Sequence, residues 1–200
     1  LLIDEYDVPV AKANNNGYYD EMLDVMKGLM QALKDNQALR FAVVTGCLKI
    51  AKESIFTGTN NFVSDTITNS RLNEYFGFVQ SEVDLLLKDA DLTTQAESIK
   101  KWYDGYLLKD YQVYNPRAVV SVMLKGEFKS YWSETASYEA IVPLINMNYD
   151  GLKTAIIEML SGGEVKVNTA TFKNDTVNIQ SKDDVLTYMI HLGYLGYDQN

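Results

Sequence analysis

Three carboxylates follow the first apolar residues of the chain. The opening LLIDEYD places Asp4, Glu5 and Asp7 directly after the apolar residues 1–3. Magnesium prefers oxygen ligands and keeps several waters, so one carboxylate at a strand end can hold it beside phosphates. A second carboxylate can orient and deprotonate the attacking water. The pattern fits nucleotide hydrolysis, with Asp4 as the metal ligand and Glu5 as the residue that activates water. Carboxylates that are merely solvated give the same pattern.

A second apolar run ends in a residue with related chemistry. FAVVTG (41–46) closes on Thr45, and Lys49 and Lys52 follow. In a phosphate site a hydroxyl at this position can sense the terminal phosphate, and a lysine can neutralise its charge. The alternative is that Thr45 satisfies a turn and that the lysines are solvated. The sequence leaves both interpretations open.

Two short strands and one helix are expected to position these residues. Residues 1–3 and 41–46 have the apolar character of buried strands, whereas AKANNNGY (11–18) predicts a loop. Residues 19–34 predict a helix whose apolar face carries Met22, Leu23, Met26, Leu29, Met30 and Leu33. Strand, helix and strand form a parallel unit, and ligands bind at the carboxyl ends of such strands. Because two strands do not make a stable sheet, further strands are expected from elsewhere in the protein or from a partner.

The middle of the chain, residues 71–131, is predicted to be helical. Ser81 to Asp84 resembles a capping box, and Asn115-Pro116 is a strong helix start. WYDGY (102–106) between them is expected to be an aromatic turn.

The last third predicts helices followed by a small β element. Helices are expected over 137–147 and 150–160, and a hairpin is expected from EVKVN (164–168) and TVNIQ (176–180). Ser181 is expected to cap a final helix, and GYLGYD after it to form a short strand. This order is typical of a winged-helix domain.

Composition excludes several classes of protein. The chain has 200 residues, 46% of them hydrophobic, and a net charge of −9, which disfavours nucleic acid as a partner. One cysteine, Cys47, and one histidine, His191, rule out a disulfide framework and a structural zinc site within the chain. No apolar run approaches the length of about 18 residues that spans a membrane, and no signal peptide is visible. A cytoplasmic protein without a membrane partner is therefore expected.

Six segments together resemble the bacterial AAA-ATPase-like family, whose members usually carry a PD-(D/E)XK nuclease-like domain at the C-terminus. Their order and approximate spacing match over essentially the whole chain. The segments are LLIDEYDVPV (1–10), VVTGCLKIAKESIFTGTNNF (43–62), EYFGFVQSEVDLLL (74–87), KWYDGY (101–106) with VYNPRAVVS (113–121), YWSET (131–135) and YMIHLGYLGYD (188–198).

The resemblance implies roles for individual residues, with ATP and Mg²⁺ as cofactors. LLIDEYD resembles the family's Walker B strand, so Asp4 would hold the metal and Glu5 would be catalytic. Thr45 and Gly46 resemble the end of its sensor strand. The segment that follows resembles a signature loop lining the nucleotide. The implied nucleotide-binding residues are Thr45, Lys49, Ser54, Asn60 and Asn61. The family commonly has arginine at Lys49, and lysine keeps the charge without the bidentate fork.

The resemblance also implies an architecture, mainly α with some β. Residues 1–66 would be the C-terminal half of an ATPase core with two parallel strands, 67–132 a helical lid, and 133–200 a winged-helix-like domain. The 200 residues contain no G-x-x-x-x-G-K-[ST] loop, the phosphate cradle of P-loop enzymes. A Walker A segment upstream and a nuclease-like domain downstream are therefore the expected partners, and a homodimer is a further expectation. The fragment alone is expected to be inactive and not to bind nucleotide tightly.

A different class of function stays open. The chain would then be a non-catalytic regulatory or protein-interaction module with a winged-helix-like domain. Recognition of nucleic acid by that domain is a third alternative, although Lys182, Asp183 and Asp184 make a poor phosphate-facing helix start. An intact upstream phosphate loop would favour the ATPase, and a degraded loop would favour the module.

Overall fold

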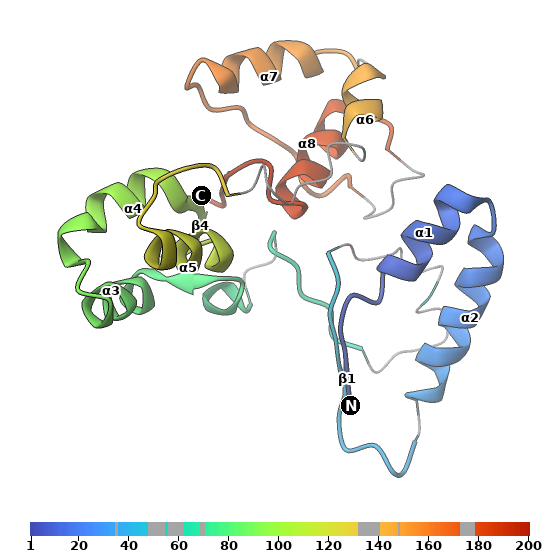
Figure 1. The fold of residues 1–200 in the computed structure, drawn as a ribbon. Helices are drawn as coiled ribbons and strands as arrows, with labels where there is room; N and C mark the ends of the chain where they lie inside the picture. The colour runs from blue at the N-terminus through green and yellow to red at the C-terminus, as the bar shows by residue number, and fades with distance from the viewer. Residues whose placement is uncertain are drawn as a thin grey trace. The chain divides into compact units, whose positions relative to one another are not determined.

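The computed structural model in Figure 1 is a mixed α/β fold with small sheets. Contacts divide the chain into two compact units, Leu1–Ser64 with Lys166–His191, and Asp65–Val165 with Leu192–Asn200. The structure describes residues 1–34, 36–47, 55, 62–68, 71–131, 141–147, 149–172 and 179–200. Within this part of the chain, no helix combines the length and the apolar character needed to cross a bilayer. The three-domain division expected from the sequence stays a prediction.

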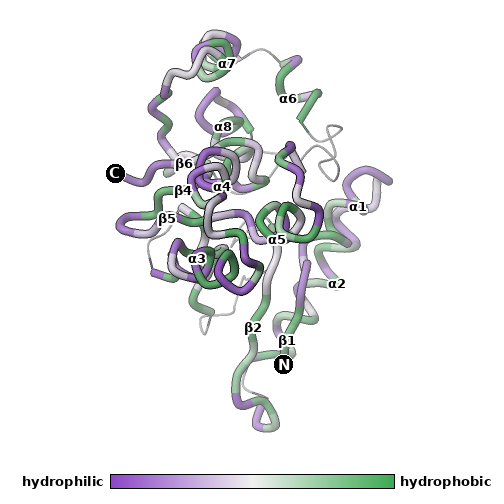
Figure 2. Tube along the Cα trace, turned by 60° about the vertical axis from the view of Figure 1, so that its left-hand side comes forward, coloured by the Kyte–Doolittle hydropathy of each residue, from purple (hydrophilic) through white to green (hydrophobic). Residues whose placement is uncertain are grey.

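The first unit begins with the predicted strand–helix–strand arrangement. Its elements are β1 (Leu2–Ile3), α1 (Val8–Asn16), α2 (Tyr19–Ala32), β2 (Val43–Val44) and α8 (Lys182–His191). β1 and β2 are parallel, and Leu2 pairs with Val43 and Ile3 with Val44. Figure 2 shows the two hydrophobic strands side by side. The parallel pairing confirms the predicted unit.

The loop predicted over residues 11–18 is wrong, because most of it lies in α1. Pro9 occupies the first turn, where its missing N–H costs nothing. Val10 and Ala13 are buried, and α1 packs on α2. Gly17, at φ 79°, ends the helix in the left-handed conformation. Burial of the apolar positions outweighs the weak helix propensity of the three asparagines.

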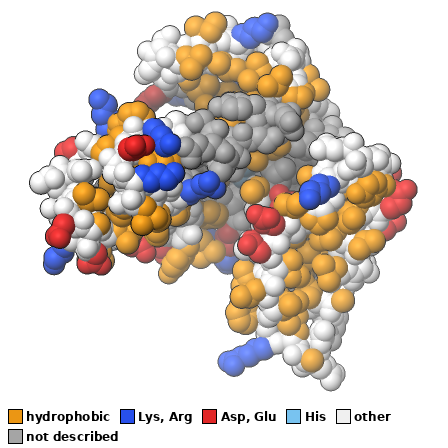
Figure 3. All heavy atoms as spheres, viewed as in Figure 1, with side chains coloured by type: hydrophobic (Ala, Val, Ile, Leu, Met, Phe, Trp, Pro, Cys, Tyr) orange, Lys and Arg blue, Asp and Glu red, His pale blue; other side chains and the backbone are white. Residues whose placement is uncertain are grey.

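The core of the first unit lies between α2 and the strands. Tyr6, Val10, Leu23, Met26, Met30, Leu33 and Ile55 are its buried members. The apolar face predicted for α2 is confirmed except at Leu29, which is 42% exposed. The two strands contribute one face only. Ile3 and Val44 pack against this core, whereas their neighbours Leu2 and Val43 are 77% and 42% exposed. Figure 3 shows hydrophobic side chains gathered on the visible surface of this unit.

The second unit contains a four-stranded sheet. Its elements are η1 (Asn73–Tyr75), β3 (Phe78–Val79), α3 (Gln80–Asp89), η2 (Thr93–Gln95), α4 (Ala96–Tyr103), β4 (Asp104–Leu108), β5 (Tyr111–Tyr114), α5 (Pro116–Lys125), α6 (Val142–Asn146), α7 (Leu152–Leu160) and β6 (Tyr197–Asp198). The strand order is β3-β5-β4-β6, and only the β4–β6 pair is parallel. The aromatic turn predicted at residues 102–106 is therefore wrong, since Asp104 opens a hairpin strand.

Helix ends in the second unit agree in part with the sequence. The Asn115 side chain accepts a hydrogen bond from the Ala118 N–H at 2.9 Å, which confirms the predicted start of α5. α3 begins earlier than the predicted box at Ser81. The Val79 N–H donates to Glu82 Oε2 at 3.0 Å. The capping bond of the glutamate type therefore joins Val79 and Glu82, two residues before the predicted pair Ser81 and Asp84. Helices α3, α4 and α5 enclose the buried core of this unit, around Tyr114 and Val119.

The winged-helix expectation gains no support from the strands. Residues 164–168 form no strand, so this half of the predicted hairpin is wrong, and residues 173–178 lie outside the described chain. The final short strand, β6, is confirmed, but its described partner is β4. The start of α8 is also confirmed, because Ser181 Oγ accepts from the Asp184 N–H at 3.1 Å. Asp184 is buried and accepts further hydrogen bonds from Thr171 Oγ1 and the Gln180 N–H.

His191, at the end of α8, should make the stability of the chain depend on pH. Burial lowers its pKa from 6.5 to about 4, and its ring lies 5.8 Å from that of Phe172. The unfolded chain therefore binds a proton that the folded chain excludes between these pH values. We expect the free energy of unfolding to fall by up to about 3 kcal/mol as the pH drops from 6.5 to 4. Urea titrations across this range measure it.

The matched variant is His191→Gln, which removes the titrating group and keeps a polar side chain. The difference in unfolding free energy between the original chain and this variant should shrink as the pH falls from 6.5 to 4. A difference that stays constant across that range would contradict the assignment, because carboxylates elsewhere contribute equally to both proteins.

Candidate functional site

The carboxyl ends of β1 and β2 lie at the same edge of the sheet. Backbone hydrogen bonds continue between the residues that follow the two strands. The Thr45 N–H donates to the Ile3 carbonyl at 2.8 Å, and the Tyr6 N–H donates to the Thr45 carbonyl at 3.0 Å. These bonds fix the backbone on both sides of Asp4. The carboxyl ends of β1 and β2 are therefore held in register, as ligand sites of parallel sheets require.

Asp4 and Thr45 meet at this edge. The Thr45 hydroxyl donates a hydrogen bond to Asp4 Oδ1, and the Glu5 N–H donates to the same oxygen at 3.0 Å. Both side chains are exposed. Within the described part of the chain, both bonds that the carboxylate accepts end on Oδ1, which leaves Oδ2 for a ligand. Residues predicted from two distant segments are thus brought together, while their roles stay predictions.

Glu5 has an unusual backbone conformation for a residue with a side chain. Its φ is 52°, in the left-handed region, which costs a non-glycine residue about 1–2 kcal/mol. Its carbonyl accepts from the Val8 N–H at 3.1 Å, so the chain turns here between β1 and α1. The side chain is exposed beside Asp4. Backbone strain of this kind clusters at functional sites. At Glu5 the left-handed backbone sets the direction in which the side-chain carboxylate points from the chain.

The backbone of Gly46 lies so close to Tyr6 and Asp7 that a residue with a Cβ atom would not fit there. A Cβ at this position would contact Asp7 Oδ1 and would lie 2.8 Å from Cδ1 of Tyr6. Asp7 is only 7% exposed and precedes the first turn of α1. The sequence indicated Gly46 only as the end of a strand. The requirement for a small residue comes from contacts with Tyr6 and Asp7, which lie far earlier in the chain, so no local pattern reveals it.

Cys47 follows Gly46 and lies within the same negative field. Although Cys47 is an exposed residue, partial desolvation of its thiol and then the charges of Asp7, Glu5 and Asp4 raise the pKa of the thiol above the ordinary value of 9.0. The thiol therefore stays protonated near neutral pH. A protonated thiol is a poor nucleophile, which agrees with the absence of a base beside it in the sequence.

Four predicted nucleotide-binding residues, Lys49, Ser54, Asn60 and Asn61, lie outside the described residues. Ile55, within the same segment, is fully buried in the core of the first unit. Phe62 packs against that core as well. The core of the unit thus holds a residue of the segment that follows β2.

Asp4 is the carboxylate at this edge that could bind a magnesium ion. The described residues contain no group of three or more His, Cys, Asp or Glu side chains that could enclose a metal. Magnesium is usually bound through one or two carboxylates, with waters and substrate phosphates completing its octahedron. Asp4, exposed at a strand end with Oδ2 open, fits that role as one ligand of a shared site.

One comparison with known proteins matches the segment that contains Asp4 and Thr45. Residues 1–56 match the AAA-ATPase_like family model, described as "Predicted AAA-ATPase". A curated relative from Azotobacter chroococcum mcd 1, "Uncharacterized protein in vnfD 5'region", is 32% identical over 147 residues, which is 72% of this chain and 28% of the relative. The chain thus matches little more than a quarter of that protein's length. No solved structure matches the chain.

Proposed function

We propose that the chain supplies the metal-binding and water-activating strand of an AAA-like P-loop ATPase, in which binding and hydrolysis of ATP drive a switch. One observation carries the proposal. Asp4 and Thr45 are hydrogen-bonded at the shared carboxyl edge of two parallel strands. They lie within the residues that match a predicted AAA-ATPase family.

Each residue has a chemical task in this proposal. Magnesium, when bound, neutralises charge on the phosphates, and Asp4 is its carboxylate ligand. Glu5 orients the attacking water and accepts its proton. The Thr45 hydroxyl has one proton, which it donates to Asp4; to sense the terminal phosphate it would exchange that bond for one to a phosphate oxygen. Lys49, Ser54, Asn60 and Asn61 are proposed for the nucleotide side on the family resemblance alone.

The remaining parts are proposed to come from outside the 200 residues. The sequence holds no phosphate loop, so a Walker A segment upstream is required for tight ATP binding. A nuclease-like domain downstream is proposed from the resemblance. Exposed Leu2 and Val43 give the two-stranded sheet an uncovered apolar face, which further strands or a second copy in a homodimer would bury.

A non-catalytic interaction module is the second candidate. It is favoured by apolar side chains that α7 leaves in solvent, with Ile157 64% and Leu160 83% exposed. The two side chains are three positions apart and so share one face of the helix, and exposed apolar side chains that gather on one face mark interaction sites. Binding of ATP by the full-length protein without turnover would favour the module.

Asp4→Asn in the full-length protein tests the proposed function. The amide keeps the volume and still accepts the Thr45 hydrogen bond, but it removes the charge that holds magnesium. We expect Mg²⁺-dependent ATP turnover to fall by at least about tenfold, with a higher Mg²⁺ concentration needed for half-maximal rate. Asp20→Asn, an exposed aspartate in the first turn of α2, is the matched control and should leave turnover unchanged. Equal activity of the Asp4 variant would reject the metal assignment.

A further inference from the structure

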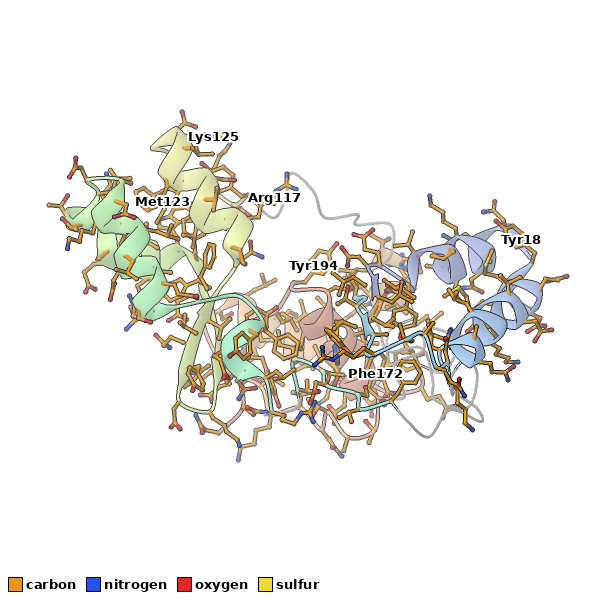
Figure 4. All side chains as sticks on the ribbon, turned by 90° about the horizontal axis from the view of Figure 1, so that it is seen from below. Tyr18, Arg117, Met123, Lys125, Phe172 and Tyr194 are labelled. Atoms are coloured by element: carbon orange, nitrogen blue, oxygen red, sulfur yellow. The ribbon has the colours of Figure 1, made fainter. Side chains whose placement is uncertain are left out.

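A small pocket in the second unit has no part in the proposed ATPase site. It has a volume of about 150 Å³ and opens where α4 leads into β4. Trp102, Asp104, Tyr106 and Asn115 contribute polar and aromatic groups to its wall. Figure 4 shows α5, the helix that Asn115 caps, with Arg117 near its start. A cavity of this volume holds a group about the size of benzene, which excludes a nucleotide.

Backbone irregularity makes room for the pocket. The register of the β4–β5 pair shifts between Asp104 and Tyr106, so Gly105 is an extra residue in a bulge. Gly196, before β6, approaches so closely that a Cβ there would lie 2.6 Å from the Gly105 carbonyl oxygen. A Cβ at Gly105 would instead meet no atom within 4 Å. Bulges are over-represented beside binding sites, where they redirect side chains.

Asp104 gives the pocket its charge. Burial raises the pKa of this carboxyl group above its ordinary value of 3.8, against the opposing effects of Lys100 and of a hydrogen bond from Gln112. Among the described residues, Asp104 takes part in none of the ion pairs, which involve Asp24, Asp65 and Asp183. None of the described residues that line the pocket is lysine or arginine. A partly desolvated carboxylate in these surroundings gains from a cation of suitable size.

The aromatic walls favour an organic cation over a metal ion. Trp102 is 51% exposed at the wall, and tryptophan attracts cations to its ring face more strongly than other aromatic residues. Burial raises the pKa of Tyr106 to about 12, so its hydroxyl is uncharged at neutral pH and adds no second anion. One carboxylate cannot enclose a divalent ion, whereas a carboxylate with aromatic faces suits a guanidinium or ammonium group.

We propose that this pocket binds an organic cation, a guanidinium or ammonium group on a short aliphatic chain, as at the end of an arginine or lysine side chain. Asp104 supplies the opposite charge, and Trp102 and Tyr106 supply the aromatic surface. The Asn115 side-chain oxygen already accepts the hydrogen bond that caps α5, so Asn115 shapes the wall and Asp104 is left as the acceptor for the cation. The site is independent of the proposed ATPase chemistry at Asp4.

Amide shifts of Gly105, Gly193 and Gly196 in ¹⁵N NMR spectra of the 200-residue chain would measure binding. The probe is N-acetyl-argininamide, and N-acetyl-citrullinamide is its neutral isostere. We expect saturable shifts with the arginine probe and at least about tenfold weaker binding of citrulline. Asp104→Asn should remove this preference, whereas Asp110→Asn, an exposed aspartate in the β4–β5 turn, should keep it. Equal binding of the two probes, or no saturable shift, would overturn the proposal.

Trp102→Leu provides a second variant, since a half-exposed side chain tolerates replacement. It should weaken binding of the arginine probe several-fold, whereas Tyr111→Leu, a 41% exposed aromatic residue of the same hairpin, should not. Equal losses in both variants would reject the aromatic contribution. Agmatine and the peptide Gly-Arg-Gly distinguish the source of the cation. Tighter binding of the peptide supports a partner polypeptide, and tighter binding of agmatine supports a free amine.

Discussion

Glu5→Gln in the full-length protein is expected to abolish ATP turnover while ATP remains bound. The amide has nearly the shape of the carboxylate but cannot accept a proton from water. Loss of a positioned general base lowers rates by about 10²–10⁴. Asp4 and its hydrogen bonds from Thr45 and the Glu5 N–H do not depend on the Glu5 side chain. The Kd for Mg·ATP should therefore change little. Single-turnover kinetics would measure the rate of hydrolysis separately from the binding of Mg·ATP.

Two variants sharpen this experiment. Glu21→Gln alters an exposed glutamate in the first turn of α2 and should leave turnover intact. Glu5→Gly removes the carboxylate and also relieves the left-handed backbone at φ 52°. It should be as inactive as the glutamine variant but no less stable in thermal unfolding. Unchanged turnover in Glu5→Gln would remove Glu5 from the mechanism even if Asp4 binds the metal.

The meeting of Asp4 and Thr45 was predictable because each residue follows an apolar run. Parallel pairing places the ends of such runs at one edge, so the meeting of Asp4 and Thr45 follows from topology. The left-handed backbone at Glu5 was not predictable, since glutamate carries no signal for positive φ. Nor was the close approach of Gly46 to Tyr6 and Asp7, which arises only when the strands pair.

The fold was predictable where local signals dominate. Asn115-Pro116 and Ser181 predicted helix starts correctly, because a cap is a contact between residues three positions apart. The β4–β5 hairpin was missed. Its turn places Lys109 at φ 55° without a glycine or asparagine, so the usual turn signal is absent. β6 completes the sheet from about 90 residues away, and such pairing leaves no local pattern.

Gly46→Ala is expected to destabilise the first unit and to disturb the site together. The added methyl group would contact Asp7 Oδ1 and lie 2.8 and 2.9 Å from two ring carbons of Tyr6. Tyr6 is 7% exposed and packed in the core of this unit, so its ring cannot move without opening that core. Overpacking of this kind costs about 1–3 kcal/mol. Urea titration of the 200-residue chain would measure the loss.

The consequence for activity follows from the backbone. Thr45 precedes Gly46, and its carbonyl accepts from the Tyr6 N–H, so a shift of Tyr6 is transmitted to the strand end that holds Asp4. ATP turnover of the full-length Gly46→Ala protein should fall with its stability. Gly28→Ala is the matched control, because a Cβ there meets nothing within 4 Å and Gly28 lies inside α2. That variant should gain about 0.5–1 kcal/mol and keep its turnover. If both glycine variants changed stability in the same direction, the tight contact would not be what constrains position 46.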